Sequence, residues 1–122
     1  MPSYELTLPY PPSNNHYKSI VTVRGKTRFF LTSATKTYLA SVAYLFKSQN
    51  GIPLDDLKLK VEIDVYPPTG KRGYDLDNYP KQVLDSLQKA GAFKNDYNIW
   101  KLNLERKEKC YGGMLKIRVS TL

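Results

Sequence analysis

The sequence predicts an α+β fold, in which a single small domain holds a mixed β-sheet and two helices. Apolar and polar residues alternate over Leu57–Val65, which is the period of a half-buried strand. Over Pro80–Ala90 the apolar residues instead recur at helical spacing. The chain has 122 residues, enough to bury one core and too few for two. We therefore expect residues 1–122 to form one domain.

The first half of the chain is predicted to supply a strand, a hairpin and a helix. Alternation over Tyr4–Leu8 indicates a strand, which the prolines after it end. Residues 20–31 contain two β-rich runs joined by Arg24-Gly25-Lys26, so we expect a hairpin with a basic tip. Ser33 is a suitable N-cap for a helix whose apolar face extends to about Ser48.

The second half is predicted to hold the other helix and two more strands. Asp77 or Asn78 is the expected cap of the helix Pro80–Ala90, and Gly91 is its stop. Its expected buried side is Val83, Leu84, Leu87 and Ala90. Two later segments alternate again, and the glycine pair between them predicts a closing hairpin made of Ile99–Arg106, Gly112-Gly113 and Met114–Ser120.

The charge balance favours a polyanionic partner. Lys and Arg number 19 against 11 Asp and Glu, which gives a net charge of +8. A field of this sign suits nucleic acid. The single cysteine, Cys110, excludes an intrachain disulfide framework and a cysteine-built zinc site. Neither a leader pattern nor an apolar run of membrane-spanning length is present, so we expect a cytoplasmic protein with no membrane partner.

Three aspartates and a lysine dominate the stretch from residue 71 to residue 96. In an extended segment, residues two apart point to the same side, so Asp75 and Asp77 are expected to project together. Lys81 follows Asp77 by about one helical turn, and the turn at Gly91 is expected to return Asp96 towards them. Carboxylate oxygens are ligands that Mg²⁺ prefers. The pattern predicts a metal-dependent phosphoryl-transfer site.

A purely structural interpretation of these residues stays open on residue chemistry alone. Asp75 and its neighbours would then form a helix-capping turn, and Asp96 would be a turn former with Asn95. Lys81 would be an exposed partner of Asp85, four residues further on. Capping needs only one acid, however, and gives no reason for the others.

Several residues suit contact with DNA. Asn14, Asn15 and Tyr17 follow a proline-rich turn, where amides and an aromatic ring suit phosphate or base contact. Basic residues in predicted loops and turns suit phosphate contact that does not depend on sequence; these are Arg24, Lys26, Lys71, Arg72 and Lys94.

Almost the whole chain resembles the RusA family of Holliday-junction resolvases, small homodimeric endonucleases of bacteria and their phages. The resemblance rests on LPYPPSNNHY after the first strand, on DLDNYPK, on DSLQKAG, and on an aspartate shortly past that helix. It implies that Asp75, Asp77 and Asp96 are catalytic carboxylates associated with Mg²⁺, with Mn²⁺ as the alternative metal, and that Lys81 is catalytic. Tyr74 stands where the family often has arginine, and Asn95 where a second acid is common.

The expected function is therefore cleavage of four-way DNA junctions by paired symmetric nicks, by a homodimer in the cytoplasm of a bacterium or of a phage-infected cell. The first alternative is a catalytically inactive module that binds DNA junctions. The second is an interaction protein that uses its acids to bind a structural cation; such a protein would lack salt-sensitive DNA binding.

Overall fold

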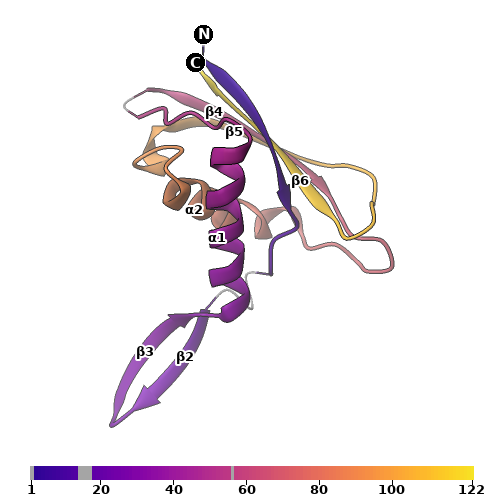
Figure 1. Cartoon of the computed structure of the whole chain (residues 1–122). Helices are drawn as coiled ribbons and strands as arrows, with labels where there is room; N and C mark the ends of the chain where they lie inside the picture. The colour runs from indigo at the N-terminus through magenta and orange to yellow at the C-terminus, as the bar shows by residue number, and fades with distance from the viewer. Residues whose placement is uncertain (1, 14–17, 56) are drawn as a thin grey trace.

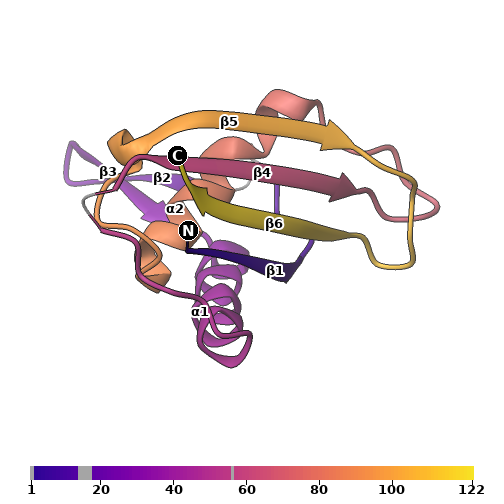
Figure 2. The same cartoon turned by 90° about the horizontal axis from the view of Figure 1, so that it is seen from above.

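A computed structural model describes residues 2–13, 18–55 and 57–122. This part of the chain folds as a four-stranded sheet with two helices on one face (Figures 1 and 2). The strands lie in the order β1 (Ser3–Pro9), β6 (Met114–Thr121), β4 (Leu59–Tyr66) and β5 (Ile99–Arg106). β6 is antiparallel to both of its neighbours, whereas β5 is parallel to β4. The mixed sheet and the two helices confirm the predicted α+β class.

The core lies between the sheet and the helices α1 (Ser33–Ser48) and α2 (Pro80–Ala90). Alternate residues of the central strand β4 are fully buried, namely Leu59, Val61, Ile63 and Val65. The predicted buried side of α2 is confirmed, with Val83 and Leu87 inside the core and Leu84 and Ala90 packed at its edge. In the described residues, no helix is long and apolar enough to cross a membrane.

The predicted closing hairpin of the last two strands is wrong. β4 lies between β5 and β6 and pairs with both, so β5 and β6 are not hydrogen-bonded neighbours in the sheet. Gly112 and Gly113 have positive φ and do form a turn. This turn connects residues that are close in sequence. β4 is more than 30 residues away from β5 and β6 in sequence, yet it is the strand that lies next to each of them. Pairing with this buried strand decides the order of the sheet.

Three predicted element boundaries also change. Thr32 rather than Ser33 caps α1, because its Oγ1 accepts a hydrogen bond of 3.2 Å from the Thr35 N–H. Neither Asp77 nor Asn78 caps α2; they lie in the short 3-10 helix η2 (Leu76–Asn78), which leads into α2 through Tyr79. The strand that was expected from residue 57 begins at residue 59.

The predicted hairpin with a basic tip is confirmed. β2 (Lys18–Val23) pairs with β3 (Lys26–Leu31), and Arg24 and Gly25 form the tip with φ of 53° and 75°. Figure 1 shows the hairpin extending away from the sheet beyond the N-terminal end of α1. Arg24, Lys26 and Arg28 are exposed in the half of the hairpin near its tip, so this end of the projection is cationic.

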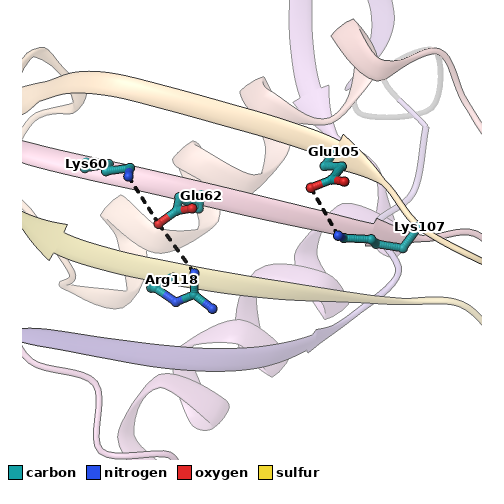
Figure 3. A network of polar contacts seen from close by, with 5 residues as sticks. All are labelled: Lys60, Glu62, Glu105, Lys107 and Arg118. Carbon is teal, nitrogen blue, oxygen red and sulfur yellow. Dashed lines mark ion pairs between the residues drawn. The ribbon is translucent and has the colours of Figure 1, made fainter.

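The sheet face opposite the helices carries balanced charge. Figure 3 shows Glu62 between Lys60 and Arg118, with N–O distances of 3.6 and 3.5 Å, and Glu105 beside Lys107 at 3.1 Å. Strand alternation and register place four acidic and four basic residues on this face, namely Glu5, Glu62, Asp64, Glu105, Lys60, Lys101, Lys116 and Arg118. The net positive charge of the chain therefore lies elsewhere.

Candidate active site

The loop that leads to the acids is fixed at its base. It leaves β4 at Pro67, whose C=O accepts a 2.9 Å hydrogen bond from the Cys110 N–H. The Thr69 N–H donates to the Cys110 C=O at 3.1 Å, and the Lys107 N–H donates to the Val65 C=O at 2.7 Å. Backbone hydrogen bonds to the segment after β5 thus hold the end of β4 and the first residues of the loop.

Three tyrosines fix the residue directly before Asp75. The rings of Tyr10, Tyr74 and Tyr79 lie with centroids 5.1 to 5.8 Å apart. The Tyr74 N–H donates to the Tyr79 hydroxyl at 3.1 Å and to the Tyr10 hydroxyl at 3.3 Å. Burial raises the pKa of the Tyr10 and Tyr74 hydroxyls, so both stay protonated and can donate hydrogen bonds. Tyrosine at position 74 is therefore an anchor for the acidic turn.

Arg106, at the end of β5, supports the same loop. Its Nη2 donates a 2.6 Å hydrogen bond to the Tyr74 C=O, which places a guanidinium beside the residue that precedes Asp75. Gly73 comes close to Pro67, where a Cβ would lie 3.1 Å from the Cβ of the proline. The loop therefore has little room at this point.

Asp75, Asp77 and Lys81 are exposed. The expected extended segment through both acids is wrong, because only Asp75 is extended and Asp77 lies inside η2. The Asn78 N–H donates to the Asp75 C=O at 2.9 Å and closes this turn. Lys81 follows in the first turn of α2, as expected.

Asp96 is also exposed and begins a second short 3-10 helix, η3 (Asp96–Asn98). The side chain of Asn95 caps this turn, with its Oδ1 accepting a 2.9 Å bond from the Tyr97 N–H. Gln88 Nε2 donates to the Lys94 C=O at 2.9 Å and holds the preceding segment to the C-terminal half of α2. Asparagine at position 95 therefore orders the turn that presents Asp96.

The structure does not gather the predicted ligands into one cluster within this chain. Among the described residues, no three His, Cys, Asp or Glu side chains are close enough to hold a metal ion together. Asp75 and Asp77 precede the N-terminus of α2, a helix roughly 16 Å long. The segment that leads to Asp96 is instead held near the C-terminal end of this helix, by the hydrogen bond from Gln88 to the Lys94 C=O. Mg²⁺ is commonly bound by one or two carboxylates, waters and substrate phosphates, so exposed Asp75 and Asp77 fit it as donors. The three-acid ligand set stays a prediction.

Two hollows flank the exposed cations Lys71 and Arg72. One is a groove of about 890 Å³ between the loop and the start of α1. The other, of about 640 Å³, is a basic pocket that Lys71 and Arg72 share with residues 106–109. Its further cations are Arg106, Lys107 and Lys109, and none of them was among the predicted DNA contacts. In the sequence, the basic run RKEK at the end of a predicted strand was the pattern that could have indicated these phosphate contacts.

The other predicted DNA contacts are not gathered at this pocket. Arg24 and Lys26 are exposed at the hairpin tip, and Lys94 is exposed after α2. Asn14, Asn15 and Tyr17 lie outside the described residues. The structure therefore places the selected cations at three locations on the chain.

These features define a class: a small basic α+β protein that presents carboxylates beside a cationic pocket, as enzymes that act on nucleic acids do. Comparison with known proteins makes the class specific. The chain belongs to the RusA family, because the family model described as Endodeoxyribonuclease RusA matches residues 9–120. By this membership it is an endodeoxyribonuclease, and the resemblance seen in the sequence is confirmed.

Curated relatives match along the full chain. The crossover junction endodeoxyribonuclease rusA of Enterobacteria phage 82 is 31% identical over 125 residues, which cover 100% of this chain and 98% of the relative. The proteins named crossover junction endodeoxyribonuclease RusA of Escherichia coli (strain K12) and of Shigella sonnei (strain Ss046) are each 30% identical, with the same coverage.

Proposed function

We propose that this chain resolves Holliday junctions by paired symmetric nicks that require a divalent metal, Mg²⁺ or Mn²⁺. The full-length similarity to crossover junction endodeoxyribonucleases carries the proposal. The exposed acids on an anchored turn, next to a basic pocket, support it.

The proposed chemistry divides between the acids and the cations. Asp75, Asp77 and Asp96 would hold the metal, which supplies a nucleophilic water and offsets charge at the cleaved phosphate. Lys81 is a flexible point charge in the first turn of α2, suited to orienting that phosphate or to stabilising the charge it develops. Lys71 and Arg72 bind the DNA backbone through phosphate contacts, together with Arg106, Lys107 and Lys109 of the basic pocket.

The proposed active species is a homodimer with one acidic site for each cut. A four-way junction offers two symmetry-related strands, and a twofold dimer addresses both with identical sites.

The deciding experiment compares a synthetic four-way junction with a linear duplex of matched sequence, with and without Mg²⁺. Paired nicks at symmetric positions are expected in the junction alone and only when metal is present. Mn²⁺ is expected to replace Mg²⁺. Equal cleavage of the linear duplex would contradict structure selectivity, and full activity in a chelator would contradict the metal requirement.

An inactive junction-binding module is the alternative, and it would require this chain to have lost the activity of its family. The absence of a three-acid cluster in the described part of the chain is the observation in its favour, because such a module would bind metal poorly. It predicts tight, salt-sensitive binding of the junction and no nick with either metal. The same assay therefore separates the two functions.

A further inference from the structure

The groove beside α1 is here called the α1 groove. The residues that line it suit a ligand made of a flat ring and an anionic group. Its volume of about 890 Å³ falls within the range of small-molecule pockets. No acid occurs among the described residues that line it, whereas Lys71 and Arg72 stand on one side. Its walls are formed largely by prolines, tyrosine rings and small hydroxyl side chains, namely Pro9, Tyr10, Pro11, Tyr38, Pro68, Ser33, Thr37 and Thr69.

One wall of the α1 groove is held in place by hydrogen bonds. The Tyr38 hydroxyl donates to the Pro9 C=O at 3.0 Å, and the Tyr74 hydroxyl donates to the Pro11 C=O at 3.2 Å. Tyr10 packs on Tyr74 with ring centroids 5.1 Å apart. A wall that is ordered before binding lowers the entropy lost when a ligand enters.

Tyr111 lines the same groove but is not part of the packed wall. It lies in the turn before β6 and is 97% exposed. A ring this exposed adds almost nothing to the core, so packing gives no reason for an aromatic residue here. An exposed ring on the side of a cationic groove is what proteins use to stack an unpaired base.

We propose that the α1 groove receives one unstacked nucleotide of the DNA strand being cut, with its base stacked on Tyr111 and its phosphates near Lys71 and Arg72. The inference rests on the proposed function. Arg72 precedes Asp75 by three residues, so their Cα atoms are at most about 10 Å apart. A nucleotide in the groove therefore lies close to the cleaved phosphate, and the groove contributes to the choice of cleavage position.

The test combines substitutions at Tyr111 with junctions that lack one base. Each junction carries a single abasic site at one position next to the wild-type cut. Tyr111→Ala should lower the nicking rate at subsaturating junction by about 5- to 150-fold, the range expected for one lost stack. Tyr111→Phe keeps the ring and should cleave like wild type. At one position, the abasic site should slow wild type by the same factor and leave Tyr111→Ala unchanged.

Tyr44→Ala is the matched control, because Tyr44 is 72% exposed on α1 and does not line the groove. The proposal is overturned if Tyr111→Ala nicks at the same rate as Tyr44→Ala. It is also overturned if, at every position tested, an abasic site slows nicking by Tyr111→Ala by the same factor as it slows nicking by wild type. Both results require that wild type cuts the junction. A wild-type protein that cuts no junction instead contradicts the proposed function.

Discussion

The three carboxylates are the residues whose negative charge the proposed reaction needs. Asp75→Asn, Asp77→Asn and Asp96→Asn each keep the size of the side chain and remove a charge that binds metal. Loss of a residue that only supports a ligand already costs 10- to 100-fold, so we expect each variant to nick junctions more than about 100-fold slower. All three residues are exposed, so thermal unfolding and junction affinity should stay close to those of wild type.

Asp55→Asn is the control for these variants. Asp55 lies in the segment before β4 and is not one of the predicted ligands, and its substitution makes the same chemical change. It should cleave at the wild-type rate. If all three acidic-site variants are folded and also cleave at that rate, these aspartates are not the metal ligands.

Tyr79 and Tyr4 provide a matched pair for the tyrosine anchor. The buried Tyr79 hydroxyl accepts from the Tyr74 N–H, which also donates to the Tyr10 hydroxyl, so Tyr79→Phe should lower the free energy of unfolding by about 0.5–1.5 kcal/mol, the net value of one hydrogen bond. The buried Tyr4 hydroxyl has no hydrogen-bond partner among the described residues, so Tyr4→Phe should leave stability unchanged or slightly higher. Urea unfolding measures both. Equal losses would mean that the Tyr79 hydrogen bond does not stabilise the loop.

Residue types were easier to select from the sequence than their positions in space. The acids, Lys81 and the basic loop are exposed, as groups that meet a substrate must be, and their roles stay predictions. The tyrosine anchor was not predicted, because Tyr10 and Tyr74 are 64 residues apart and only the fold brings them together. Tyr111 was not selected either, since sequence alone does not tell an exposed tyrosine from a buried one.

At the scale of elements, the loop after β4 is expected to set the salt dependence of junction binding. Each phosphate contact adds about 0.9 to the slope of log affinity against log salt. Replacing Lys71 and Arg72 together by alanine should therefore reduce the slope by roughly 2. The slope is measured from junction affinities over a series of salt concentrations.

Lys47→Ala combined with Lys89→Ala is the control, because it removes two exposed charges from the last turns of the two helices. This pair should leave the slope nearly unchanged. If the two double variants change the slope equally, net charge rather than the loop determines binding.

Elements with a local period were predictable, and those set by distant partners were not. The alternation of β4 and the helical period of α2 appear in eight and eleven residues respectively. The sheet order depends on which strand takes the place beside β4, a choice made between segments far apart in sequence. Likewise η2 replaced the expected cap of α2, because Tyr79 is drawn into the core between Asn78 and Pro80.

At the scale of the whole molecule, charge is separated by face. The strands carry equal numbers of acidic and basic residues on the open face of the sheet, and its ion pairs are partly exposed (Figure 3). Such pairs contribute little to stability. The cationic surface consists mainly of the β2–β3 hairpin and the basic pocket at residues 71–72 and 106–109. DNA is therefore expected to approach the hairpin and the loop rather than the open sheet.

The last prediction concerns the proposed homodimer, in which each subunit's acidic site makes one cut. A dimer of one wild-type and one Asp77→Asn subunit should nick a junction once and seldom make paired cuts, because the second strand faces a site without its full charge. A cruciform plasmid reports both products, since one nick relaxes it and paired cuts linearise it. A mixed dimer with Asp55→Asn should linearise it like wild type. Efficient paired incision by the Asp77→Asn mixed dimer in one binding event contradicts the model, as does sedimentation as a monomer at concentrations that resolve junctions.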